Sequence, residues 1–191
     1  LFRASSPADA HERFTYLSTE PPATRDDLVS WMREVTVDPG RRYYAVVDAR
    51  TGRVEGRQAF LRIDAPNRSI EIGDIYWGPS MARTRVATEA FHLFARHAFE
   101  VLGCRRFEWK CNALNAPSVR AARRFGFRDE GTFRNAMIMK GRSRDTAWFS
   151  ITDDEWPRLD AAFVTWLDPA NFDADGVQRT PLAARVVQDT S

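Results

Sequence analysis

One stretch of the chain, residues 69–113, restricts the possible folds more than any other. It begins with a strand-like run, SIEIGDIYW (69–77), shows helical periodicity from about residue 84 to 102, and ends with the alternating run RRFEWKCNA (105–113). Two strands joined through a helix lie parallel in one sheet, with a right-handed crossover. The sequence therefore predicts a parallel pair of strands with a helix packed over it.

The flanking segments add mostly antiparallel elements. The run TRDDLVSWMREV (24–35) predicts a helix because Thr24 and Asp27 can form a capping box. Asn115 can cap a short helix in NAPSVRAARRFGF, where Pro117 lies in the first turn and Gly126 ends it. Further strands are expected in 42–49, 55–64, 130–140 and 144–152, and a last helix in 153–167. The fold class is therefore α+β: a mixed, mostly antiparallel sheet with helices on both faces.

Composition limits the kind of protein that this fold can serve. The 191 residues suggest one domain, residues 1–167, followed by a tail, residues 168–191. A net charge of only +2 argues against a nucleic-acid binder. No apolar run approaches the roughly 20 residues of a membrane span. Two cysteines, Cys104 and Cys111, make neither a disulfide framework nor a metal cluster, so we expect no metal and a cytoplasmic location.

The loop GPSMARTRVATEA (78–90) connects the first strand of the parallel pair to its helix. Unpaired amides at a helix N-terminus attract anions, so the amides from Met81 to Ala87 can face a pyrophosphate. Arg83 and Arg85 can add charge-assisted hydrogen bonds. Alternatively, both arginines simply solvate an ordinary loop. His92, farther along the same helix, is expected on the solvent face.

The order of elements, with GPSMARTRVATEA, WKCNALNAPSVRAARRFGF and RDTAWFSI, resembles the GNAT superfamily of N-acetyltransferases. The likeness covers residues 24–157 and is strongest to the Rim-type branch of ribosomal-protein and other N-terminal acetyltransferases. In that family a Q/R-x-x-G-x-G/A loop binds the pyrophosphate of acetyl-CoA. Here its polar position falls on Ser80 and its glycines fall on Arg83 and Arg85. Either the amides still bind, reinforced by the arginines, or binding has been lost.

The resemblance also implies roles for individual residues. It places Asn115 and Ser118 beside the thioester sulfur, where Ser118 can protonate the departing thiolate, although both can equally be helix-capping residues. Arg124 belongs to a cluster with Arg120, Arg123 and Arg128 near the adenosine 3′-phosphate, or to a solvated face. The implied cofactor-binding set is Trp77, Met81, Arg83, Thr84, Arg85, Val86, Ala87, Thr88, Asn112, Asn115 and Arg124.

An amine must lose a proton before it attacks a thioester, so a carboxylate base is needed. Glu71 is the first candidate because its position matches a catalytic glutamate of many family members. Asp74 is the second candidate and Glu108 the third, and a buried ion pair is the alternative for each. The amide near Trp77 is the expected oxyanion donor.

The function that follows is transfer of an acetyl group from acetyl-CoA to a primary amine, in a ternary complex. The amine can belong to a protein N-terminus or to a small molecule. Two alternatives stay open: a binding or regulatory module without turnover, and a transferase that uses another acyl or aminoacyl donor. The family normally begins with a strand that is not visible here, so we expect that strand to be missing, and a homodimer can supply the edge.

Overall fold

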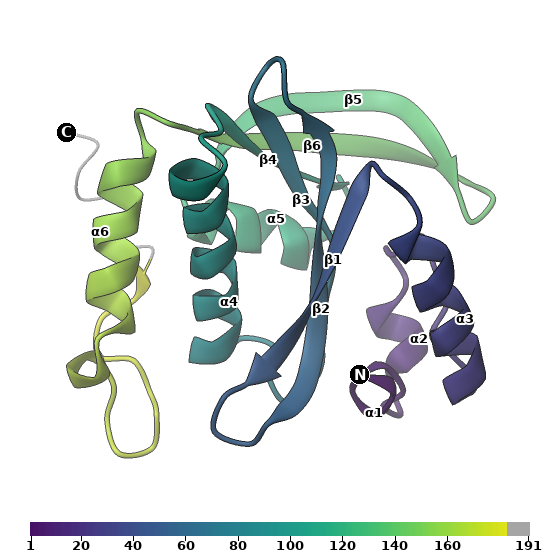
Figure 1. Cartoon of the computed structure of the whole chain (residues 1–191), viewed down its shortest axis with the longest axis horizontal. Helices are drawn as coiled ribbons and strands as arrows, with labels where there is room; N and C mark the ends of the chain where they lie inside the picture. The colour runs from purple at the N-terminus through teal and green to yellow at the C-terminus, as the bar shows by residue number, and fades with distance from the viewer. Residues whose placement is uncertain (183–191) are drawn as a thin grey trace.

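The computed structural model describes residues 1–182, in which six strands form a single mixed sheet (Figure 1). The spatial order is β1-β2-β3-β4-β6-β5. β3 and β4 are parallel, and every other neighbouring pair is antiparallel. The strands are β1 Arg41–Asp48, β2 Arg53–Asp64, β3 Ser69–Trp77, β4 Arg106–Asn112, β5 Arg128–Met139 and β6 Arg142–Thr152. The predicted α+β class with one parallel pair is confirmed.

Helices cover both faces of the sheet, as predicted. Figure 1 shows α4 and α6 on one side of the sheet and α1, α2 and α3 on the other. The helices are α1 Phe2–Ser5, α2 Ala10–Arg13, α3 Arg25–Thr36, α4 Arg85–Arg96, α5 Ala116–Arg124 and α6 Trp156–Leu167. α4 continues into a π-helical turn, η1 His97–Val101, and η2 Pro169–Asn171 is a short 3-10 turn. The predicted caps are present: Thr24 and Asp27 form the capping box, and Asn115 caps α5.

The space between the sheet and α4, α5 and α6 is filled mainly by aromatic side chains. Phe91 of α4 is fully buried and stacks on Phe125 with ring centroids 4.2 Å apart. Phe163 of α6 and Phe107 of β4 also contact Phe91. Burying aromatic rings removes a large apolar area from water, so this layer is the main source of stability.

The opposite face is held by a different kind of contact. Arg57 of β2 is buried, its guanidinium lies 4.3 Å from the Trp31 ring centroid, and burial lowers its pKa. Tyr76 packs against Phe14 and donates to the carbonyl of Ala4 at 2.6 Å. Residues 1–22 thus form short helices and turns against the sheet. No strand precedes α3 in the described residues, and the missing family strand stays a prediction.

The parallel pair separates part of the way along its length. β3 and β4 pair with each other from Ser69–Arg106 to Ile72–Trp109. Beyond these residues both strands continue, but they no longer pair with each other. Asp74 has a φ of 46°, a left-handed conformation that interrupts the regular pleat of β3. The strands therefore diverge in the middle of the sheet.

One expectation about α4 was wrong. The side chain of His92 is buried, its Nε2 lies 2.6 Å from Oδ1 of Asp160, and its ring stacks on Phe163. Both partners belong to α6, which covers the face of α4 that the sequence pattern assigns to solvent.

The chain after α6 turns back along that helix. Gln178 accepts a hydrogen bond from Nε1 of Trp166 at 2.9 Å, and Leu182 is fully buried in the main core. Residues 183–191 lie outside the described residues, and the division into a domain, 1–167, and a tail, 168–191, stays a prediction.

Candidate active site

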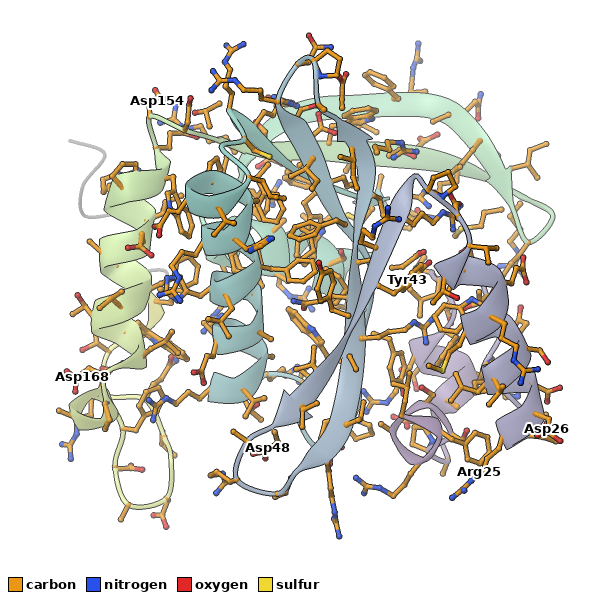
Figure 2. The ribbon with its side chains drawn as sticks, viewed as in Figure 1. Arg25, Asp26, Tyr43, Asp48, Asp154 and Asp168 are labelled. Carbon is orange, nitrogen blue, oxygen red and sulfur yellow. The ribbon has the colours of Figure 1, made fainter. Side chains whose placement is uncertain are left out.

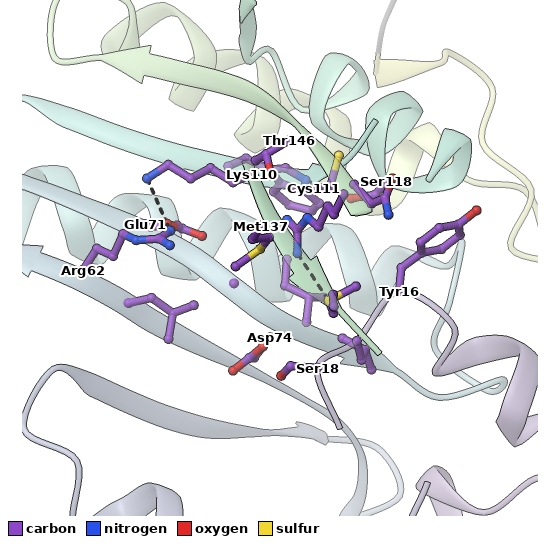
Figure 3. Close-up of a pocket in the computed structure, with 18 of the residues that line it drawn as sticks. Tyr16, Ser18, Arg62, Glu71, Asp74, Lys110, Cys111, Ser118, Met137 and Thr146 are labelled. Carbon is purple, nitrogen blue, oxygen red and sulfur yellow. Dashed lines mark hydrogen bonds and ion pairs between the residues drawn. The ribbon is translucent and has the colours of Figure 1, made fainter. Parts of the chain in front are cut away.

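A cavity of about 610 Å³ opens where β3 and β4 diverge, on the side of the sheet that faces the N-terminal helices. It brings together residues from the middle of β3, the end of β4 and the start of α5. Tyr16 and Ser18 of the N-terminal segment and Met137 of β5 also line it (Figure 3). Of the residues predicted from sequence, it gathers Glu71, Asp74, Asn112, Asn115 and Ser118.

Glu71 is the most enclosed carboxylate of this cavity, with 4% of its surface exposed. Arg62 donates to it at 2.6 Å and the ammonium of Lys110 lies 3.1 Å away (Figure 3). The buried ion pair that the sequence left as an alternative is therefore present. Both cations contact the same oxygen, Oε2. Oε1 accepts no hydrogen bond from residues 1–182, so this oxygen can take a proton directly or through water.

Asp74 is held by two partners at the cavity wall. The hydroxyl of Tyr43 donates to its carboxylate, and a guanidinium nitrogen of Arg41 lies 3.8 Å from it. Burial, and then the hydrogen bond to Asp74, raises the pKa of Tyr43 to about 12, so this phenol stays protonated at neutral pH. Figure 2 shows Tyr43 between β1 and the N-terminal helices, where it packs on Trp31. Both contacts reach the same oxygen, Oδ2, so Asp74, like Glu71, has a second carboxylate oxygen that accepts no observed hydrogen bond from residues 1–182.

Glu108 lines a second cavity, which shares Arg62, Lys110 and Trp148 with the first but does not include Ser118. Burial raises the pKa of Glu108, but hydrogen bonds from Arg106 at 2.7 Å and contact with Lys110 at 2.6 Å outweigh it, and the net pKa is below its usual value. A carboxylate with a lowered pKa is a weaker base. Glu71 shares its cavity with Ser118, whereas Glu108 does not, so Glu71 is the better placed of the two.

Ser118 sits in the first turn of α5 with its hydroxyl accepting from Nε1 of Trp109 at 3.0 Å. Its amide donates to Asn115 at 3.2 Å, which is the capping contact expected from sequence. Indole nitrogen is a donor only, so the proton of Ser118 must point to another acceptor. The nearby Cys111 is one neighbour: burial raises the pKa of this thiol and the Ser118 hydroxyl lowers it. Asn115 is therefore the cap of α5, and the Ser118 hydroxyl, which accepts from Trp109, keeps a geometry compatible with a proton donor.

The amide of Trp77 faces the gap left by the diverging strands. The amide of Gly78 donates to Glu55 at 2.8 Å, so these two residues form a hydrogen-bonded pair of the antiparallel ladder. The next pair, Gly56 and Trp77, is then a non-hydrogen-bonded one, in which amides point away from the partner strand. The Trp77 amide is therefore directed away from β2, where an oxyanion donor is expected.

The start of α4 is uncapped. Its N-cap, Thr84, makes no side-chain cap hydrogen bond, and its hydroxyl donates instead to Met81 at 2.6 Å. The amides of the first turn, at Arg85, Val86 and Ala87, precede the first i to i−4 bond of the helix. Arg83 has a φ of 66°, the left-handed conformation that glycine favours. The loop thus keeps a glycine-like backbone at one of the two positions where arginine replaces glycine.

Two arginines near this helix start have different tasks. Arg85 donates to the carbonyl of Leu167 at 2.5 Å and lies over the ring of Phe172, so one of its terminal nitrogens is engaged with the end of α6. Arg124 donates to Thr88 at 3.1 Å and stacks over Trp166, and burial lowers its pKa. Arg124 contacts no carboxylate among residues 1–182, so its charge is free for an anion at this end of α4.

The other members of the arginine cluster point elsewhere. Arg123 pairs with Asp129 at 2.8 Å, and Arg128 pairs with Glu155. Arg120 is exposed. For Arg123 and Arg128, ion pairing is the arrangement observed, and Arg124 is the residue that turns toward α4.

Sequence reasoning missed the four basic residues of the cavity: Arg41, Arg62, Lys110 and Arg144. Lys110 had a signal, because the alternation of RRFEWKCNA places it opposite the apolar face, and a parallel register brings it beside Glu71. Arg62 and Arg144 approach from β2 and β6, and no local pattern marks them.

The fold and the cavity define an enzyme of the acetyltransferase class. Residues 1–128 match the family model described as an acetyltransferase (GNAT) domain. The crystal structure of a GCN5-related N-acetyltransferase from Brucella melitensis is 51% identical with a TM-score of 0.96, covering 98% of this chain and 85% of that one. A GNAT-family structure from Chromobacterium violaceum is 38% identical with a TM-score of 0.77, over 82% and 78%. This chain belongs to the GNAT family of N-acetyltransferases.

Two further comparisons bear on the branch and on ligands. "Putative ribosomal N-acetyltransferase YdaF" of Bacillus subtilis is 28% identical over 131 residues, 65% of this chain and 70% of that protein, consistent with the Rim-type branch. The spermidine N-acetyltransferase of Vibrio cholerae, solved with CoA and spermine, shares the fold at 20% identity and a TM-score of 0.63, over 76% of this chain and 85% of that one.

Residues 1–182 contain neither a metal-binding cluster nor a membrane-spanning helix. This part of the chain contains no group of three or more His, Cys, Asp or Glu side chains placed to hold a metal ion. None of its helices combines the length and the apolar character needed to cross a membrane.

Proposed function

We propose that the protein transfers an acetyl group from acetyl-CoA to a primary amine, directly, in a complex that holds both substrates. The observation that carries this proposal is the cavity at the divergence of β3 and β4, because it holds a base candidate, Glu71, and an acid candidate, Ser118, together. The Trp77 amide points away from β2 at the same divergence. A base, an acid and an oxyanion donor are the groups that acyl transfer to an amine requires.

Binding of acetyl-CoA would use the uncapped start of α4. The amides of Arg85, Val86 and Ala87 are suited to the pyrophosphate, and the charge of Arg83 lies beside them. Arg124, fixed by Thr88, supplies a second cation at this end of the helix. The remaining members of the implied set, Met81, Asn112 and Asn115, shape the loop and the cavity wall rather than offering charge.

In the transfer step, Oε1 of Glu71 would receive a proton from the incoming ammonium, directly or through one water. The neutral amine then attacks the acetyl carbonyl, and the Trp77 amide stabilises the oxyanion. The carbon–sulfur bond then breaks, and Ser118 gives its proton to the departing thiolate. Ser118 regains a proton, directly or through water, from the nitrogen of the tetrahedral intermediate, which must lose its second proton to become the amide. Asp74, which already accepts from Tyr43, positions the wall of the cavity.

The finer features of the earlier predictions stay proposals. The acceptor amine can belong to a protein N-terminus or to a small molecule, and another acyl donor or a module without turnover would leave the same fold. A cytoplasmic location and a homodimer are likewise predictions of this proposal.

The first test is calorimetric titration with acetyl-CoA. Micromolar binding by the native chain, weakened by Arg83→Ala together with Arg124→Gln, would support the assignment of the α4 start. Arg123→Gln is the matched control, because this arginine is exposed and paired with Asp129. Thiol release in the presence of a panel of amines then tests turnover. No binding at millimolar acetyl-CoA would refute the proposal, and binding without turnover would favour the regulatory module.

A further inference from the structure

The charges that line the large cavity do not cancel. Its acidic residues are Asp38, Glu71 and Asp74, and its basic residues are Arg41, Arg62, Lys110 and Arg144. Three of the four cations are paired with these carboxylates: Arg41 with Asp38 and Asp74, and Arg62 and Lys110 with Glu71. The fourth cation, Arg144, contacts no carboxylate among residues 1–182.

The surroundings of Arg144 leave its charge unsatisfied. Among residues 1–182, its enclosed Nε has no hydrogen-bond partner, and the one acceptor observed for its Nη1 is the sulfur of Met139, at 3.5 Å. A thioether is a weak acceptor. Burial lowers the pKa of Arg144, and the charges of Glu71 and Asp74 raise it from a distance. A guanidinium stays charged at neutral pH under such shifts. The cavity wall therefore presents an unpaired cation to which an anion can bind.

The position of Arg144 on β6 suits recognition of one end of a small molecule. Thr146 lies two residues on, so its buried side chain shares the cavity face of the strand with Arg144. Phe133 and Met137 of β5 provide apolar wall nearby. A cavity of about 610 Å³ is within the size range of small-molecule sites.

We propose that the acceptor is an amine that also carries a carboxylate, and that Arg144 binds this carboxylate. This inference rests on the proposed acetyltransferase function and names its substrate class. The amine end would lie toward Glu71, and the carboxylate end would accept hydrogen bonds from the terminal nitrogens of Arg144. A guanidinium and a carboxylate form a strong, charge-assisted pair. A polyamine, in contrast, would bring extra positive charge against an unpaired cation.

The carboxylate can come from a free amino acid or from an acidic residue at the start of a peptide. The two sources are separated by two matched pairs of acceptors: phenylalanine against phenylalaninamide, and aspartyl-alaninamide against asparaginyl-alaninamide. Acetylation rates are compared per unprotonated amine, since the members of a pair differ in amine pKa. In the native protein we expect kcat/KM to favour the carboxylate member of at least one pair by about 10- to 100-fold.

The variant that tests the assignment is Arg144→Gln. It should lower kcat/KM for the preferred carboxylate acceptor by about 10- to 100-fold and leave the matched amide within about twofold. Arg144→Lys keeps the charge and should recover part of the loss. Arg142→Gln is the matched control: Arg142 is an exposed arginine of the same strand, outside the cavity, and its loss should change neither acceptor.

Three results would overturn the inference: equal rates for both members of both pairs, faster acetylation of spermidine than of any carboxylate acceptor, or an equal loss for both members in Arg144→Gln. The first two leave acetyl transfer itself intact, so they separate this inference from the proposed function. Should the native chain acetylate nothing, calorimetric binding of the same acceptors in the presence of CoA decides. Weaker carboxylate binding by Arg144→Gln supports the inference, and equal binding rejects it.

Discussion

The two halves of the candidate site are built from different materials. The start of α4 offers backbone: amides of the first helical turn and a left-handed residue, Arg83, with a φ of 66°. The cavity between β3 and β4 offers side chains: Glu71, Ser118 and a set of arginines and lysine. Backbone donors are supplied by almost any residue, whereas a side-chain site depends on each residue type. The difference explains how a loop can replace glycines with arginines and keep its geometry.

The largest effect is expected at Glu71. Glu71→Gln removes the proposed base and should lower kcat/KM by about 100- to 10,000-fold, while the affinity for acetyl-CoA measured by calorimetry stays close to native. Glu108→Gln is the control, because Glu108 also pairs with Lys110 but lies in the other cavity. An equal loss of rate in both variants would show that the Lys110 network, and not a base, is what Glu71 supports.

Ser118→Ala separates acid catalysis from capping. We expect kcat to fall by about 10- to 100-fold, and stability to fall by about 1–3 kcal/mol because the indole nitrogen of Trp109 loses its acceptor. Asn115→Ala removes the cap alone and should cost about 0.5–2 kcal/mol with little change in kcat. Denaturant unfolding and steady-state rates measure the two effects. Ser118→Ala with native kcat would leave Ser118 a purely structural residue.

On the donor side, Arg124→Gln should raise the Kd for acetyl-CoA by about tenfold, because a partly buried cation pairs strongly with phosphate. Removal of the 3′-phosphate from the cofactor should give a similar loss in the native protein and none in the variant, if this is the group that Arg124 binds. Unchanged affinity in Arg124→Gln would assign the residue to packing over Trp166.

The smallest effect is expected at Arg83. This residue tests most directly whether the start of α4 binds through its backbone and not through side chains. Arg83→Gly keeps the left-handed backbone and removes an exposed charge, so the affinity for acetyl-CoA should change by at most about fivefold. Arg83→Val puts a β-branched residue at a positive φ and should destabilise the loop by about 1–2 kcal/mol. A strong loss of binding in Arg83→Gly would mean that this half of the site also depends on a side chain.

The sequence predicts the fold well because its signals are local. The strand, helix and strand between residues 69 and 113 require a parallel pair, and the caps at Thr24 and Asn115 are where the pattern places them. The start of α4 can also be predicted from local sequence, because the first amides of a helix have no hydrogen-bond partner within that helix.

The rest of the site depends on partners distant in sequence. His92 was assigned to solvent because the pattern of α4 cannot reveal that α6, 68 residues away, covers that face. The side chain of Arg85, which the sequence predicts at the phosphate, also reaches Leu167, 82 residues on, and no local pattern marks this contact. Arg62 and Lys110 meet Glu71 only through the register of β2, β3 and β4. The choice among carboxylates therefore needs the assembled sheet.

The contact between Arg85 and Leu167 has a practical consequence for anyone who edits this gene. A single residue gives its amide to the first turn of α4 and its side chain to the carbonyl at the end of α6. A fusion partner or a shortened clone that disturbs residues 167–172 would therefore also disturb the proposed pyrophosphate site at the start of α4. Domain boundaries drawn for expression should extend past Leu182, which is fully buried.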